Sequence, residues 1–135
     1  MLVRNYVGGV VFSGDSVLLL KNEQGEWRLP RKAIRKGENP NEVAVKKIEE
    51  GLGIATEIAY TAGQTNYEFS SLTRQKPFWN KTTWYVMKPL NENKTKNKET
   101  GNIGFVKIDK AMDIIDSSQD KSLINLYFKK YKGLA

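Results

Sequence analysis

The chain has 135 residues, a net charge of +7 at pH 7, and neither cysteine nor histidine. Its length fits one compact domain, so we expect a single domain over residues 1–135. The missing residue types exclude disulfides, a thiolate zinc site and a Ser-His or Cys-His triad. No apolar run reaches the length of a membrane-spanning helix, and the first residues carry no signal-peptide pattern. We therefore expect a cytoplasmic protein that does not associate with membranes.

The positive charge favours an anionic partner, such as a nucleotide, a nucleic acid or an acidic surface. Most of the basic residues are lysines in polar stretches, a composition that an ordinary solvated surface also has. The arginines differ, because Arg28, Arg31 and Arg35 fall within eight positions. Without cysteine and histidine, any acid-base or metal chemistry falls mainly to Asp, Glu, Lys and Tyr, and carboxylate ligands suit Mg²⁺ or Mn²⁺.

Strand patterns and a basic loop come before the first helical pattern. Residues 3–12 are rich in β-forming side chains and predict a strand. Gly8 and Gly9 lie within it, and glycine inside a strand often marks a bulge or a close backbone approach. Residues 17–21 predict a short buried strand, and residues 31–37 predict a basic loop.

A helix is expected to start at Pro40, a residue that suits the first helical position. Asn39 can cap this helix, and Glu42 completes a pattern that resembles a capping box. Gly51 and Gly53 are expected to end it. Apolar residues at helical spacing predict a face that is turned to the core: Val45, Ile48 and Leu52.

The remaining chain is predicted to form further strands and a last helix. The strands are predicted at residues 54–61, 66–70, 81–87 and 103–108. Residues 91–102 are polar, rich in Lys and Asn, and predict a surface loop. The last helix is predicted over residues 118–132, and Ser117 with Asp120 can cap it. This order of elements predicts an α/β (α+β) fold in which a mixed sheet lies between helices.

Residues 32–54 fit one pattern without insertion or deletion: Gly-x5-Glu-x7-Arg-Glu-U-x-Glu-Glu-x-Gly-U, where U is a bulky aliphatic residue. The matching positions are Glu38, Ile48, Glu50, Gly53 and Ile54, and the departures are Lys32, Lys46, Lys47 and Gly51. This segment resembles the Nudix box, a loop-helix-loop motif, in a degenerate form. The surroundings resemble the branch of the Nudix family that includes MutT-like and diadenosine polyphosphate hydrolases. They are Gly8-Gly9, Trp27-Arg28-Leu29-Pro30, Tyr67-Glu68-Phe69 and Trp84 to Met87.

The resemblance implies a metal-dependent site that this chain has largely lost. In the Nudix family, the positions of Lys47, Glu50 and Gly51 carry three carboxylates that hold divalent metal ions against the substrate diphosphate. Their spacing of three and four residues places them on one helix face. An ammonium on that face would repel a divalent ion, so we expect binding of Mg²⁺ or Mn²⁺ to be weak or absent. Glu50 is left as the catalytic candidate, and as a metal ligand only if a metal is bound.

Seven basic and two acidic residues lie between positions 28 and 47. In the family this region faces a polyphosphate, so the resemblance implies direct charge contacts to phosphates. The candidate ligand-binding residues are Arg28, Arg31, Lys32, Arg35 and Lys47. Neutral drift of an inactive enzyme towards a lysine-rich composition explains the same pattern equally well. Glu38 and Lys46 resemble the family's Glu-Arg pair, which braces the loop against the helix, and we assign them a structural role.

Three functions follow from these observations, and the sequence leaves open whether the protein is an enzyme. The first is binding of a nucleotide-like or polyphosphate small molecule, with pyrophosphohydrolase activity impaired or absent. The second is an active Nudix hydrolase that cleaves nucleoside diphosphates linked to another moiety through a rearranged Mg²⁺ or Mn²⁺ site. The third is a non-catalytic module that binds RNA or a protein. The ligand's identity, the oligomeric state and the pathway are not determined by the sequence.

Overall fold

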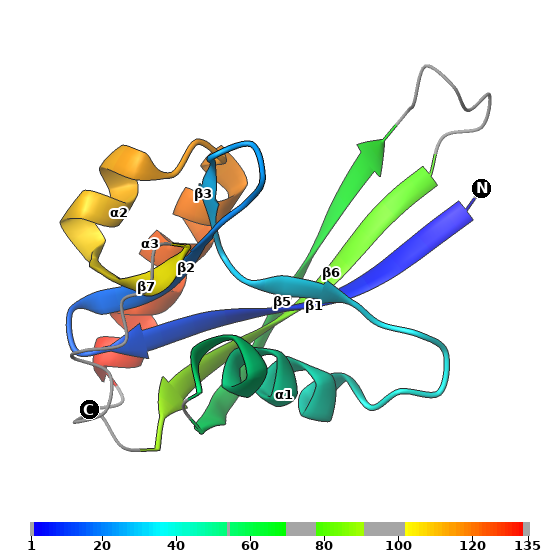
Figure 1. The fold of residues 1–135 in the computed structure, drawn as a ribbon, viewed down its shortest axis with the longest axis horizontal. Coiled ribbons are helices and arrows are strands. Elements are labelled where there is room, and N and C mark those ends of the chain that lie inside the picture. Colours follow the sequence, from blue (N-terminus) through cyan, green and yellow to red (C-terminus); the bar gives the residue numbers. More distant parts are fainter. Residues whose placement is uncertain (1, 54, 70–77, 91–101, 134–135) are drawn as a thin grey trace.

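The structure, a computed structural model, describes residues 2–53, 55–69, 78–90 and 102–133 (Figure 1). Its strands are β1 (Leu2–Ser13), β2 (Ser16–Lys21), β3 (Trp27–Arg28), β4 (Arg31–Ala33), β5 (Thr56–Phe69), β6 (Phe78–Pro89) and β7 (Ile103–Lys107). Its helices are α1 (Pro40–Leu52), α2 (Ile108–Ile114) and α3 (Ser118–Gly133). None of the helices in these ranges has the length and apolar content needed to cross a membrane.

Strand β1 pairs with three other strands, β2, β4 and β6. Most of it pairs in parallel with β6, from Leu2 opposite Phe78 to Val11 opposite Met87, while its middle pairs antiparallel with β4. The end of β1 pairs antiparallel with β2, which also pairs with β3 and β7. Strand β5 lies at the edge, antiparallel to β6. This combination of parallel and antiparallel pairs confirms the predicted mixed sheet.

Helices α1 and α3 cover opposite faces of the long strands. Successive strand residues point to opposite sides of a sheet, so neighbouring residues of β1 contact different helices. On one face, Phe12 and Trp84 pack in the same core cluster as Ile124 of α3. On the other face, Val11 packs in a second cluster with Ile48 of α1. Figure 1 shows α1 on one side of the strands and α3 on the other. The predicted sheet between helices is therefore confirmed.

Gly8 allows a close approach between β1 and a side chain of β6. It lies directly opposite Trp84 in the β1–β6 pairing, and the Trp84 side chain is completely buried. A Cβ atom added to Gly8 would lie 2.4 Å from the Trp84 ring, far inside van der Waals contact. The prediction that these strand glycines mark a close approach is confirmed at Gly8.

Helix α1 begins and ends where local signals predict. The Asn39 side chain accepts hydrogen bonds from the backbone N–H groups of Asn41 and Glu42, and Pro40 occupies the first helical turn. Gly53 ends the helix in the left-handed conformation with φ of 71°, which glycine adopts without steric cost. The helix runs one residue beyond Gly51, so Gly51 is helical.

Two element predictions were wrong in extent. The strands predicted at 54–61 and 66–70 meet in a single strand, β5 (Thr56–Phe69), whose pairing with β6 is interrupted by register shifts after Ile58 and Thr61; residues 54 and 70 lie outside the described residues. These shifts let a polar stretch remain in the sheet without a turn. The basic loop predicted at 31–37 begins with β4, since Arg31 pairs opposite Gly8. Of the polar loop predicted at 91–102, residues 91–101 lie outside the described residues.

Candidate functional site

A buried carboxylate joins the last helix to the segment between β3 and β4. Asp120, in the first turn of α3, has a fully buried side chain. Its Oδ2 accepts a hydrogen bond from the backbone N–H of Leu29 at 3.1 Å. Arg31 Nη2 donates to both carboxylate oxygens at 2.9 Å. A buried charge is tolerated only when it is paired and hydrogen-bonded, so these bonds fix α3 against this segment.

The two arginines beside Asp120 differ in how fully they are bonded. The Arg31 guanidinium lies 5.1 Å from the centre of the Trp84 ring, and its side chain is 24% exposed. Burial lowers the pKa of Arg31, and the nearby Asp120 charge opposes this shift. Arg28 Nε lies 3.8 Å from Asp120 Oδ2, which is too far for a hydrogen bond. This buried Nε has no hydrogen-bond partner, and the Arg28 side chain is 40% exposed, so Arg28 is less firmly held than Arg31.

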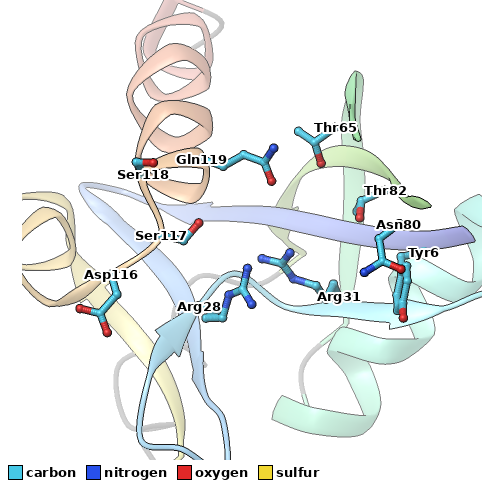
Figure 2. A pocket seen from close by; sticks show the side chains of 10 residues that line it. All are labelled: Tyr6, Arg28, Arg31, Thr65, Asn80, Thr82, Asp116, Ser117, Ser118 and Gln119. Carbon is cyan, nitrogen blue, oxygen red and sulfur yellow. The ribbon is translucent and has the colours of Figure 1, made fainter. Parts of the chain in front are cut away.

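A cavity of about 610 Å³ lies between the start of α3 and the long strands. We call it the α3 cavity. Its lining residues are Tyr6, Arg28, Arg31, Thr65, Asn80, Thr82, Asp116, Ser117, Ser118 and Gln119. Figure 2 shows both guanidinium groups between the strand side chains and the first turn of α3. Asn80 Oδ1 is also buried without a hydrogen-bond partner, so two of the lining residues, Arg28 and Asn80, each keep an unpaired polar atom beneath the cavity surface.

A second cavity, of about 430 Å³, opens beside the end of α1. We call it the α1 cavity. Its lining residues are Leu20, Lys21, Asn22, Arg28, Leu29, Arg31, Gly51, Asn102 and Ile103. Three of these side chains are cationic and none is acidic, which favours an anion. Arg28 and Arg31 line both cavities, so the two arginines form a shared wall between them.

The family model described as NUDIX domain matches residues 3–127 of this chain. The chain belongs to the NUDIX family. The predicted family resemblance is therefore confirmed, and the family is one of pyrophosphohydrolases that act on nucleotide-linked substrates and generally use a divalent metal.

Solved structures of NUDIX proteins share the fold of this domain. The Ap4A hydrolase of C. elegans has a TM-score of 0.69 at 20% identity, covering 99% of this chain and 100% of that chain. A NUDIX hydrolase from Nitrosomonas europaea has a TM-score of 0.68 at 16% identity, covering 96% and 72%. A MutT protein from Bacillus halodurans has a TM-score of 0.64 at 19% identity, covering 90% and 80%. At these identities the likeness concerns the fold alone.

Within this NUDIX domain, the three box positions on α1 lie in different surroundings. Gly51 lines the α1 cavity. Lys47 is half-buried and Glu50 is exposed, and neither lines the α1 or the α3 cavity. Lys47 lies between the exposed and the buried sides of the helix, since Ala44 and Ile48 beside it are buried.

The other predicted site residues divide in the same way. Arg28 and Arg31 line the cavities, whereas Lys32 and Arg35 are exposed and line neither of them. Glu38 accepts a hydrogen bond from the backbone N–H of Arg35 at 2.7 Å, which holds the loop before α1. Among the described residues no ion pair joins Glu38 to the exposed Lys46.

Sequence reasoning missed most of the α3 cavity, because its residues come from distant parts of the chain. Tyr6, Asn80 and Gln119 carry no local motif that places them together. The sequence predicts for Asp120 only a role as a helix cap, because its buried contacts are 89 and 91 residues away in sequence. One signal did exist: Asp120 shares a helix face with the apolar Leu123 and Ile124, where an unpaired charge would not be buried.

Proposed function

We propose that this NUDIX domain binds a nucleotide-like or polyphosphate ligand and that its metal-dependent pyrophosphohydrolase activity is impaired or absent. The observation that carries this proposal is the α1 cavity, where Gly51 replaces a family carboxylate and the charged lining residues are all cationic. The proposal takes the protein to act in the cytoplasm as a single domain over residues 1–135. It also takes the degenerate box over residues 32–54 to be the cause of the lost activity.

The residues present do not fit a Mg²⁺ or Mn²⁺ site. Such ions take several oxygen ligands, and two of the three box positions offer none, since they are Lys47 and Gly51. Throughout the described ranges, no three acidic side chains lie close enough together to hold a metal ion. Glu50 alone remains at these positions, and it is exposed. These residues therefore support no metal-dependent catalytic step.

Direct contacts can replace the lost metal in holding phosphates. Charge-assisted hydrogen bonds from arginine to phosphate are short and strong. Arg28 lines the α1 cavity with a side chain that is 40% exposed, and Lys21 lines the same cavity. Lys32, Arg35 and Lys47 add positive charge at a greater distance, so we propose a steering role for them.

Metal-free nucleotide binding is the expected result of the first test. ADP binding, measured by calorimetry, should be unchanged by EDTA. Dinucleoside polyphosphates, nucleotide sugars and nucleoside triphosphates should release no phosphate or nucleotide in a manner that saturates with Mn²⁺. Saturable Mn²⁺-dependent hydrolysis would support the active enzyme, which family membership also favours. Binding of short RNA with a steep salt dependence, without mononucleotide binding, would support the non-catalytic module.

Arg28 is expected to contribute more to ligand binding than the exposed cations of the box loop. Arg28→Gln should weaken metal-free ADP binding by at least about tenfold, since it removes a charge-assisted hydrogen bond. Lys32→Gln and Arg35→Gln should each weaken it by no more than about threefold, because exposed charges are screened. Lys110→Gln removes the same charge from the exposed side of α2 and serves as the matched control. Equal losses in all four variants would mean that only net charge matters.

A further inference from the structure

We propose that Asp120 is a positioning residue for the ligand site: it fixes the segment from Arg28 to Arg31 so that the partly exposed Arg28 guanidinium faces the ligand. The role requires that Asp120 act through Arg28 rather than touch the ligand. Because this role rests on the proposed ligand binding, the tests below include one that needs no ligand.

Asp120 holds this segment at three points. Its Oδ2 accepts a hydrogen bond from the backbone N–H of Leu29, the residue that follows Arg28. Its two carboxylate oxygens accept hydrogen bonds from Arg31 Nη2. These bonds hold the Arg31 guanidinium in a fixed position against the Trp84 ring. The Asp120 charge lies 3.8 Å from Arg28 Nε without a hydrogen bond. The carboxylate therefore attracts Arg28 without accepting a hydrogen bond from its Nε–H.

The charges explain why the carboxylate is needed. Two guanidinium groups that share one wall repel each other, and the Arg28 charge contributes to the lowered pKa of Arg31. Asp120 is the buried anion between them. Without its charge, Arg28 and Arg31 are expected to separate and the Arg28 donors to leave the shared wall of the two cavities. Arg31 thus has a structural role in the ion pair with Asp120, and Arg28 is the arginine that can bind the ligand.

The sign of the change in affinity separates positioning from simple electrostatics. Asp120→Asn removes a negative charge beside an anion site, which by electrostatics alone would tighten ADP binding. If Asp120 positions Arg28, the same change should weaken binding by about tenfold, the loss expected for one charge-assisted hydrogen bond. Asp116→Asn is the matched control, since Asp116 is an exposed acid that lines the α3 cavity rather than the proposed ligand site and makes no hydrogen bond or ion pair with the segment from Arg28 to Arg31. That variant should not weaken binding.

A double-mutant cycle tests whether Asp120 acts through Arg28. Metal-free ADP affinity should be measured by calorimetry for wild type, Asp120→Asn, Arg28→Gln and the double variant, at a temperature where circular dichroism shows all four folded. In the Arg28→Gln background, Asp120→Asn should cause no further loss, because the residue it positions is gone. Full additivity of the two losses would overturn the proposal, as would an unchanged or tighter affinity of Asp120→Asn.

A ligand-free measurement keeps the role testable even if ADP does not bind. The Nε–H signals of Arg28 and Arg31 can be followed by ¹⁵N NMR and assigned with Arg28→Lys and Arg31→Lys. In Asp120→Asn, the Arg28 signal should shift or broaden while the signals of α1 and β6 remain in place. An unchanged Arg28 signal would overturn the positioning role. If neither ADP nor pyrophosphate binds to wild type, the proposed function fails, and this comparison decides the role of Asp120 by itself.

Discussion

Changing Lys47 and Gly51 together to glutamate is expected to create a divalent-metal site on α1. The two new carboxylates would join Glu50 at the i, i+3 and i+4 positions of one helix face, and oxygen ligands suit Mn²⁺ and Mg²⁺. There is room for the new side chain at position 51, because an added Cβ would lie 3.4 Å from Ile103 Cδ1 and the position borders the α1 cavity. At a metal concentration 100 times the Kd, the gain in stability is about 2.7 kcal/mol.

Thermal denaturation across a Mn²⁺ titration measures this gain. The double variant should melt several degrees higher at saturating Mn²⁺, and without metal it should be less stable than with it because three crowded carboxylates repel one another. Lys110→Glu with Gly51→Glu is the matched control, since it makes the same charge change but places one acid on α2 instead of α1. Wild type should show little shift. A strong, saturable shift in wild type would contradict the proposed function and favour the active hydrolase.

Gly8→Ala is expected to destabilise the fold strongly. The new Cβ would overlap the Trp84 ring, at 2.4 Å from its nearest atom. The ring cannot move away easily because Trp84 is completely buried within the core cluster that contacts α3. Overpacking of a rigid core costs about 1–3 kcal/mol or more, which corresponds to a fall in melting temperature of roughly 5–10 °C. Urea or thermal unfolding followed by circular dichroism measures the loss.

The neighbouring glycine offers a matched control in the same strand. A Cβ added to Gly9 would lie 3.0 Å from Met87 Sδ, and a methionine side chain can adjust by rotation about its flexible bonds. Gly9→Ala should therefore cost clearly less than Gly8→Ala. Equal losses would mean that general strand effects, rather than the Trp84 contact, determine the cost. The same experiment also reports on the site, since Arg31 lies against the Trp84 ring.

The sequence by itself determined the family, the sheet between helices and the limits of α1. Those limits depend on groups within a few residues of each other: the Asn39 side chain bonds the next two N–H groups along the chain, and Gly53 adopts a conformation that other residues avoid. The box spacing and its surroundings extend along nearly the whole chain, so the fold could be predicted. The missing carboxylates at positions 47 and 51 are also evident from the sequence alone.

Only the tertiary structure decided which of the clustered basic residues form a site. Arg28, Arg31, Lys32 and Arg35 are neighbours in sequence, but the first two reach the shared wall of the cavities while the last two remain in solvent. The difference between Arg28 and Arg31 depends on Asp120, about 90 residues away along the chain. No local pattern encodes that contact, because it arises when α3 packs against the sheet and buries a carboxylate that must then find cationic partners.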